Sequence, residues 1–209
     1  MAINPQSEQP HPGGPMSVEE YLRLDRTSYN ARYEYIDGVA RMMSGGSKEH
    51  DDIAFNMRTA LKQQFLSGPC SVQGSDMQVV VGTKEDGQPQ YYYPDVTVTC
   101  NVADRQKRGI KQIESPLIVV EVLSPSTEST DRHAKLQAYQ ACPTMHEIVF
   151  INQFARYVEV YHRDEKDNAI WRRVIYDHNA SFITLPSHDI EIEMDEIYSG
   201  IDFNLPLEE

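Results

Sequence analysis

The sequence predicts an α+β fold with a mixed β-sheet. Short apolar segments of strand length recur along the 209 residues, and two longer segments place apolar residues at helical spacing. The last third of the chain alternates between apolar segments and turn-forming residues, which indicates a β meander. The expected order is helix, hairpin, helix, three strands, helix, strand and meander, which is typical of an α+β domain.

The N-terminal part divides into a tail and the start of a domain. Residues 1–15 are rich in Pro, Gly and Gln, and we expect them to be a disordered tail. We interpret residues 16–205 as a single domain, because the chain length suits one core. Ser17, followed three residues later by Glu20, is a capping-box pattern and predicts a short helix. Asp37-Gly38 between two alternating segments predicts a β-hairpin.

Local signals place the central elements. Ser47 is expected to cap a helix over residues 49–66, whose apolar residues share one face, and Gly68-Pro69 ends it. Residues 71–81 alternate as one strand, and further strands are expected at residues 95–100 and 118–123, joined by a polar connection. A second helix is predicted from about residue 130 to 141, where Cys142-Pro143 stops it.

The meander is predicted from strands over residues 146–152, 157–163, 170–176 and 181–185, with a helical turn near 195–198. Its apolar and aromatic side chains make it a candidate surface for pairing two subunits. A symmetric homodimer would suit this arrangement, since twofold dimers are the commonest oligomers.

Composition narrows the class of protein. The net charge is −13, with 32 Asp and Glu against 19 Lys and Arg, which argues against a broad basic surface for nucleic acid. A nuclease that uses a divalent metal and a local basic patch is still compatible with this charge. We find neither an apolar run long enough to span a membrane nor a secretory signal.

The three cysteines lie far apart in the sequence and form no paired motif. Cys70, Cys100 and Cys142 therefore suggest neither a disulfide framework nor a zinc site. From these observations we expect a cytoplasmic protein with reduced thiols.

Two acidic residues on apolar strands suggest a site. Glu121 interrupts the apolar segment of residues 118–123, and Asp95 follows Pro94 at the start of the preceding strand. A buried carboxylate is costly unless it is paired or coordinates a metal, and Mg²⁺ or Mn²⁺ needs only one or two carboxylates. Alternatively, Asp95 caps a turn and Glu121 faces solvent.

Asp95 and Glu121 lie in segments that resemble a known protein family. The segments that carry the resemblance are YEYIDGVARMMSGG, EHDDIAFNM, GPCSVQGSDMQV, YYYPDVTV, PLIVVEVLSPSTESTDRHAKLQAY and VEVYHR, between about Ser17 and Phe203. In this order they resemble the Uma-type restriction endonuclease family, within the PD-(D/E)xK nuclease superfamily. The resemblance implies a restriction-endonuclease-like mixed sheet flanked by helices, with an N-terminal hairpin and a C-terminal meander. It also implies hydrolysis of DNA.

The sequence departs from the superfamily motif at one position. The motif expects Lys two residues after the Glu, and here that residue is Leu123. In families of this kind a lysine can come from the following helix, and Lys135, fourteen residues past Glu121, is the candidate. Otherwise Lys135 is an ordinary exposed helix lysine. Its neighbours Asp131 and Arg132 are more simply interpreted as first-turn charge and surface.

Three further residues are weaker candidates for the site. The resemblance places an extra acid at Glu34, although a residue alternating with two tyrosines also suits solvent exposure. His50 is a candidate to contact phosphate or a metal-bound water, or it simply packs or caps the helix. Asp76 is a third possible acid.

Basic residues gather in the connection between the two acid-bearing strands. Arg105, Lys107, Arg108 and Lys111 are candidates to hold a phosphate backbone, if this is not merely a solvated loop. Ser124, at the end of the Glu121 strand, is a candidate to donate a hydrogen bond to the same phosphate, or it belongs to the cap of the next helix.

The leading hypothesis is an endonuclease that hydrolyses DNA phosphodiester bonds with Mg²⁺ or Mn²⁺. Asp95 and Glu121 would hold the metal, and Lys135 would replace the missing motif lysine. The alternative is a catalytically weak or inactive nucleic-acid-binding or regulatory module on the same fold.

Overall fold

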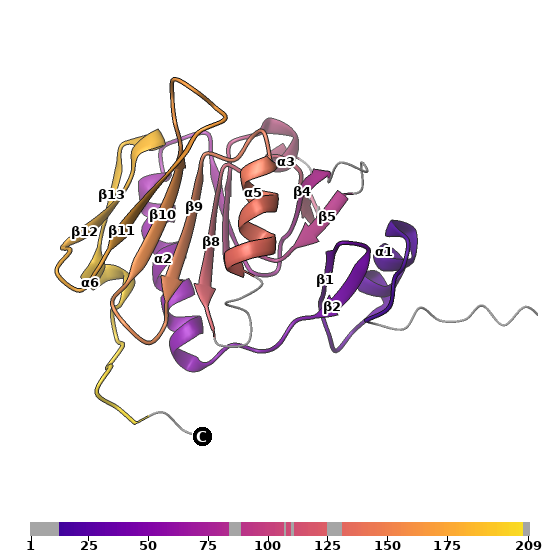
Figure 1. The fold of residues 1–209 in the computed structure, drawn as a ribbon, viewed down its shortest axis with the longest axis horizontal. Helices are drawn as coiled ribbons and strands as arrows, with labels where there is room; N and C mark the ends of the chain where they lie inside the picture. The colour runs from indigo at the N-terminus through magenta and orange to yellow at the C-terminus, as the bar shows by residue number, and fades with distance from the viewer. Residues whose placement is uncertain (1–12, 84–88, 107, 110, 125–130, 207–209) are drawn as a thin grey trace, which may run out of the picture.

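A computed structural model describes residues 13–83, 89–106, 108–109, 111–124 and 131–206 of the chain (Figure 1). Within these ranges the chain forms two main β-sheets and a small third one, with helices packed against them. The fold is α+β with a mixed sheet, as predicted. No described helix has both the length and the apolar character that crossing a membrane requires.

A six-stranded mixed sheet forms the centre of the molecule. Its strand order is β11-β10-β9-β8-β6-β3, with β8 and β9 parallel and the other neighbours antiparallel. Its strands are β3 (Ser71–Gly74), β6 (Val96–Thr99), β8 (Ile118–Leu123), β9 (Glu147–Asn152), β10 (Val158–Arg163) and β11 (Trp171–Tyr176).

A five-stranded sheet packs beside it, in the order β2-β1-β5-β4-β7. Its strands are β1 (Tyr33–Ile36), β2 (Val39–Met42), β4 (Gln78–Thr83), β5 (Pro89–Tyr92) and β7 (Gln112–Ile113). The remaining pair, β12 (Phe182–Leu185) and β13 (Ile190–Glu193), forms a two-stranded sheet followed by the short helix α6 (Met194–Ile197).

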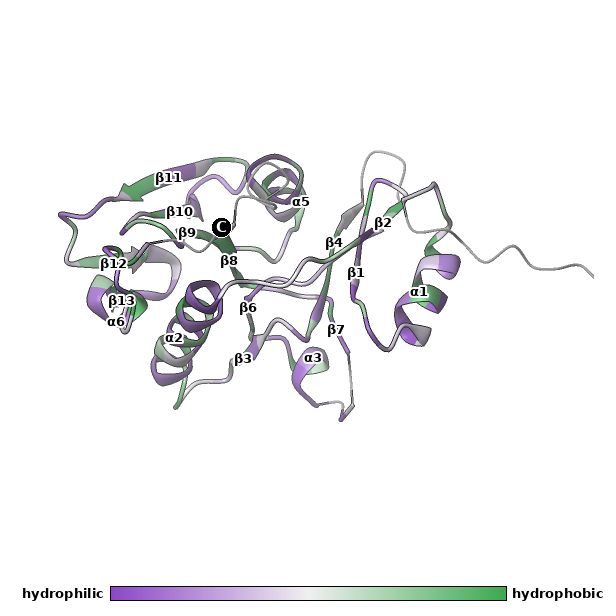
Figure 2. Ribbon diagram, turned by 90° about the horizontal axis from the view of Figure 1, so that it is seen from below, coloured by the Kyte–Doolittle hydropathy of each residue, from purple (hydrophilic) through white to green (hydrophobic). Residues whose placement is uncertain are grey.

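Strand β8 is buried on both faces, which explains its continuous apolar sequence. Ile118, Val120 and Val122 face a core that includes helix α2 (Lys48–Gln64), β12 and β13. Val119 and Leu123 face the opposite core, formed with the five-stranded sheet and helix α5 (Leu136–Ala141). Figure 2 shows β8 as a strongly hydrophobic strand between α2 and α5.

The N-terminal signals identify real elements. Ser17 caps α1 (Val18–Thr27), and Glu20 completes the capping box. Asp37 and Gly38 have φ of 55° and 80°, the left-handed values that a tight hairpin turn between β1 and β2 requires. Helix α1 and this hairpin lie at one end of the molecule (Figure 1). Ser47 caps α2 as predicted, and its hydroxyl accepts from the His50 backbone N–H.

The structure corrects the prediction in the middle of the chain. The single strand expected over residues 71–81 is two strands, β3 and β4, that belong to different sheets. The polar connection contains helix α3 (Val102–Gln106) and strand β7, and the strands β5 and β13 were not predicted. The helix expected from residue 130 begins, within the described residues, as a π-helical turn, Asp131–Lys135, that continues into α5.

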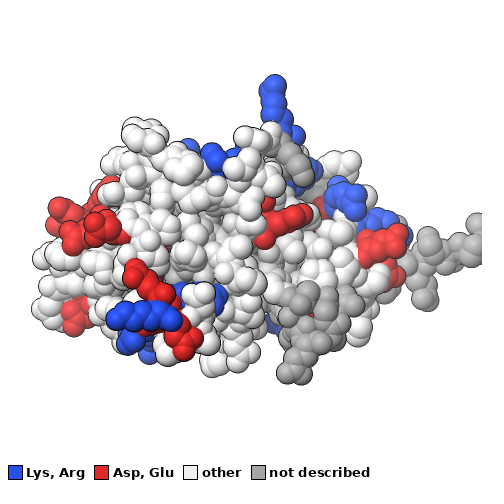
Figure 3. Space-filling model, turned by 90° about the horizontal axis from the view of Figure 1, so that it is seen from above, with Lys and Arg blue, Asp and Glu red and all other residues white. Residues whose placement is uncertain are grey.

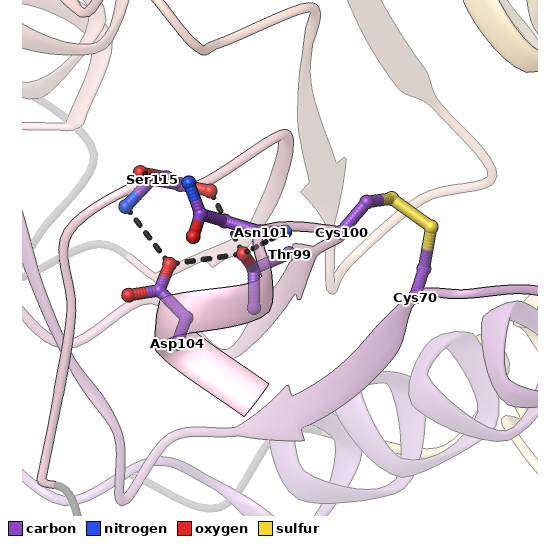
Figure 4. The surroundings of a disulfide bond; sticks show 6 residues. All are labelled: Cys70, Thr99, Cys100, Asn101, Asp104 and Ser115. Carbon is purple, nitrogen blue, oxygen red and sulfur yellow. Dashed lines mark hydrogen bonds between the residues drawn. A yellow bond between two sulfur atoms is a disulfide. The ribbon is translucent and has the colours of Figure 1, made fainter. Parts of the chain in front are cut away.

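The prediction of three reduced cysteines is wrong. Cys70 and Cys100 form a disulfide with 4.0 Å between their Cα atoms (Figure 4). Cys142 is free and buried. The cause is the pairing of β3 with β6, in which Ser71 stands opposite Thr99. The two cysteines are therefore neighbours across the ladder, although 30 residues separate them in sequence.

Candidate active site

A cavity of about 620 Å³ lies where both main sheets approach the start of α2. Its walls come from the β1–β2 hairpin, the loop before α2, the start of β6, the end of β8 and the turn before α5. Five of the predicted residues line this cavity together with Ser124: Glu34, His50, Asp95, Glu121 and Lys135.

Asp95 reaches the end of β8 because of the strand register. Val96 pairs with Val120 in the antiparallel ladder, so Asp95 and Glu121 are the next positions along the two strands. The backbone N–H of Val122 donates to Asp95 Oδ2 at 2.7 Å, and His50 Nε2 lies 2.9 Å from Oδ1. Both oxygens of Asp95 are therefore held in place.

Glu121 is buried, with 4% of its surface exposed, on the face of β8 that packs toward α5. Tyr139 Oη donates to Glu121 Oε1 at 2.6 Å, and Lys135 Nζ lies 3.1 Å from the same oxygen. The pKa of Tyr139 lies well above its usual range. Burial is the largest cause, and the nearby charges of Glu121 and Glu34 add to it. Tyr139 therefore keeps its proton and acts as a donor to the carboxylate.

Glu34 enters the same cluster from β1. Its side chain is buried, and its Oε1 lies 2.9 Å from Lys135 Nζ. The Tyr93 backbone N–H, two residues before Asp95, donates to the same oxygen at 3.1 Å. Glu34 therefore does not face solvent, which was the alternative interpretation.

Lys135 lies between two carboxylates from different strands. The π-helical turn at Asp131–Lys135 places it there, and only 4% of the residue is exposed. Leu123 shares the strand face of Glu121 but packs into the apolar core, so no cation comes from that position. Lys135, from the turn before α5, contacts Glu121 instead. Lys135 is not an ordinary exposed helix lysine.

The donor chemistry of the cavity suits a hard divalent cation. Asp95 and Glu121 provide carboxylate oxygens from adjacent strands, and Mg²⁺ is commonly held by one or two carboxylates plus water and phosphate. Among the described residues, no three or more His, Cys, Asp or Glu side chains are grouped so that they could hold a metal by themselves. Two carboxylates would leave the other coordination positions of such an ion to water and substrate.

The remaining predicted residues lie away from this cluster. Asp76 is exposed and pairs with Arg32 at 2.9 Å, without lining the cavity. Arg105 lines a separate cavity of about 200 Å³, and Lys111 lines another of about 370 Å³. Arg108 is exposed and lines neither the cavity of Asp95 nor these two, while Lys107 lies outside the described residues.

Sequence reasoning missed a hydroxyl donor to Glu121 and three basic residues that line the cavity. Tyr139 was not among the candidate site residues, although its position four residues after Lys135 places both on one helix face. Arg41 was not considered, although the Asp37-Gly38 turn sets it opposite Glu34 in the hairpin register. Arg32 and Lys48, which also line the cavity, carried no signal beyond their charge.

The fold is that of an α+β protein with a mixed central sheet and a polar cavity at the edge of that sheet. The structure is similar to one solved as a "putative nuclease belonging to DUF820" from Anabaena variabilis ATCC 29413, with a TM-score of 0.68. The similarity covers 88% of this chain and 98% of that one at 15% sequence identity, so it supports the fold alone.

The sequence match gives the family. Residues 18–195 match the Uma2 family model, described as "putative restriction endonuclease", and the chain belongs to this family. It is 32% identical to the uncharacterized protein slr1290 of Synechocystis sp. (strain ATCC 27184 / PCC 6803 / Kazusa) over 90% of this chain and 94% of that protein. A second uncharacterized protein of that strain, sll1609, is 26% identical over 71% of this chain and 81% of its own length.

Proposed function

We propose that the chain is a metal-dependent endonuclease that hydrolyses DNA phosphodiester bonds in this cavity. The observation that carries the proposal is the contact of Lys135 with Glu121, beside Asp95. These three residues supply the acid, acid and lysine of a PD-(D/E)xK site, with the lysine relocated from the position of Leu123. Membership of the family supports a nucleic-acid substrate.

Asp95 and Glu121 would hold Mg²⁺ or Mn²⁺. A bound divalent ion polarises a phosphoryl oxygen and makes water a better nucleophile by lowering its pKa. Glu34 is a third carboxylate within reach of the same lysine, and its negative charge would lie near a bound ion.

The protein's own groups have separate roles. The ammonium of Lys135 would orient the attacking water or stabilise negative charge that develops on the phosphate. Tyr139 fixes Glu121 through its hydroxyl, while His50 and the Val122 N–H fix Asp95. These hydrogen bonds hold the carboxylates in one geometry before substrate binds, which lowers the cost of organising the reaction.

The test is cleavage of supercoiled and linear duplex DNA by purified protein in Mg²⁺ or Mn²⁺. We expect Asp95→Asn, Glu121→Gln and Lys135→Met each to lower the rate by about 100-fold or more, because each removes transition-state stabilisation. Lys62→Met is the matched control, since Lys62 is an exposed lysine of α2 that does not line the cavity. Activity that survives all three site variants would reject the proposal.

The alternative, an inactive or weak nucleic-acid-binding module, has one observation in its favour. Lys135 already contacts both Glu34 and Glu121, and an internal cation of this kind competes with a metal for the same oxygens. Calorimetry with Mn²⁺ separates the two functions. The nuclease requires metal binding that weakens in Asp95→Asn and strengthens in Lys135→Met, whereas absence of binding at millimolar Mn²⁺ favours the module.

A symmetric homodimer remains part of the proposal, through one strand of the expected meander. Val158 and Val160 are buried within the subunit, so they are not available for pairing. Strand β11 forms the edge of the six-stranded sheet and exposes Val174 and Ile175. Light scattering during gel filtration should give twice the subunit mass, and Ile175→Lys should restore the monomer mass.

A further inference from the structure

The cavity differs in charge from the rest of the chain. Four of the 19 Lys and Arg residues line it, against four acids, whereas the whole chain has 32 acids. The cations are Arg32, Arg41, Lys48 and Lys135, and the acids are Glu34, Asp51, Asp95 and Glu121. Figure 3 shows another part of the surface, where small groups of both signs are separated by uncharged atoms. A polyanion that avoids an acidic surface would therefore meet balanced charge at the cavity.

Arg41 is the cation whose position is hardest to explain by packing. Its residue is exposed on β2, directly across the hairpin from Glu34. Directly opposed residues of an antiparallel pair project to the same face, so the strand pair that sends Glu34 into the cluster sends Arg41 to the rim. Among the described residues, no hydrogen bond or ion pair involves the Arg41 guanidinium.

Arg32 and Lys48 flank the same opening, and each forms an ion pair with an exposed carboxylate. Arg32 pairs with Asp76, whose side chain is 94% exposed, and also donates to the Ser75 carbonyl at 2.6 Å. Lys48 pairs with Asp52 at 2.7 Å on the first turns of α2. Exposed ion pairs of this kind contribute little in water, so either cation can exchange its carboxylate for a phosphate. Gly46 and Ser47 bring the N-terminus of α2 to the same rim, where backbone N–H groups favour an anion.

We propose that Arg41, together with Arg32 and Lys48, binds the backbone phosphates of duplex DNA that flank the bond held at Asp95 and Glu121. This inference rests on the proposed function and names the surface through which its substrate is held. It replaces the connection around Arg105 and Lys111 as the phosphate-binding segment, because those residues line other cavities.

The test is equilibrium binding of a short fluorescent duplex in EDTA or Ca²⁺, measured by anisotropy between about 50 and 200 mM salt. Arg41→Gln should weaken binding about tenfold and reduce the slope of log affinity against log salt by about one, since one phosphate contact and its released counterion are lost. Arg41→Lys should restore most of the slope, because the contact depends on charge.

Two further arginines complete the design. Arg23→Gln is the matched control, since Arg23 is an exposed arginine of α1 outside the cavity, and it should leave the salt slope unchanged. An unchanged slope in Arg41→Gln, or an equal decrease in Arg41→Gln and Arg23→Gln, overturns the inference. A decrease in Arg108→Gln alone would instead assign binding to the α3 side and likewise overturn it.

Because binding is measured without cleavage, the two proposals fail separately. A protein that binds DNA through Arg41 but cuts nothing in Mg²⁺ or Mn²⁺ would reject the nuclease and keep this surface. A protein that cuts DNA with an unchanged salt slope in Arg41→Gln would do the reverse.

Discussion

Glu159 anchors the turn that carries Lys135, and breaking this anchor should lower activity. Glu159 lies on β10 with 1% of its surface exposed. Its Oε1 accepts from Arg132 Nη1 at 2.5 Å, and its Oε2 accepts from Arg173 at 2.8 Å and from Tyr161 at 3.0 Å. Arg132 belongs to the π-helical turn, three residues before Lys135, so it is not merely a surface charge. Arg173 belongs to β11, which does not line the cavity.

The carboxylate of Glu159 stays ionised in the folded protein. Burial raises its pKa, but hydrogen bonds from Arg132 and Tyr161, together with the charges of Arg132 and Arg173, lower it overall. A hydrogen bond to a charged group contributes about 1.5–3 kcal/mol. If Arg132→Gln loses this free energy because Lys135 is no longer held in place, the turnover rate should decrease by about 10- to 100-fold.

Arg173→Gln is the matched variant, because it removes a contact to the same carboxylate from the strand side. Arg173 is 44% exposed, so solvent screening makes its contact the weaker one. The assay is kcat and KM for duplex cleavage, with urea unfolding measured on both variants. We expect kcat to decrease in Arg132→Gln with KM little changed, and both to be retained in Arg173→Gln. Equal loss of kcat in the two variants, or full activity in Arg132→Gln, would refute this reasoning.

Two further predictions concern stability. Burial raises the pKa of Glu147 to about 7 from an ordinary 4.5. Between these two pH values the folded state holds a proton that the unfolded state releases. The free energy of unfolding should therefore decrease by about 3 kcal/mol as pH rises from 4.5 to 7. Glu147→Gln should remove this decrease in urea titrations and leave the opposite trend of His146 and His188, whose pKa values burial lowers; an unchanged pH profile would contradict the assignment. Replacing Cys70 and Cys100 by Ser should cost about 3–4 kcal/mol, because the disulfide closes a 30-residue loop. Calorimetry should then show a lower Tm for the variant than for the oxidised wild type, and no difference once both are reduced.

Elements with a local signal could be predicted from the sequence. The capping box at Ser17, the Asp37-Gly38 turn and the cap at Ser47 each identify an element that the structure contains. The division of residues 71–81 between two sheets could not be foreseen. The two strands separate at a tight turn in which the Met77 N–H donates to the Gly74 carbonyl, and only tertiary packing decides the sheet that each strand joins.

The site was predictable in part, for a similar reason. Asp95 and Glu121 lie at the ends of neighbouring strands, so a sequence pattern and one assumption about pairing bring them together. Lys135 required a turn of unusual geometry, and its hydrogen-bonding neighbour Tyr139 gave no signal apart from its spacing. The Cys70–Cys100 disulfide depends on strand register, which the spacing of cysteines does not contain.

The two acid partners of Lys135 belong to different sheets. Glu34 is carried by the five-stranded sheet and Glu121 by the six-stranded sheet, so one ammonium group joins the two layers. Any sliding of one sheet over the other changes how many carboxylates share that ammonium. The alignment of the two layers therefore sets the ion pairing of Lys135, and a substitution far away in their shared core can alter the geometry of the cavity without contacting it.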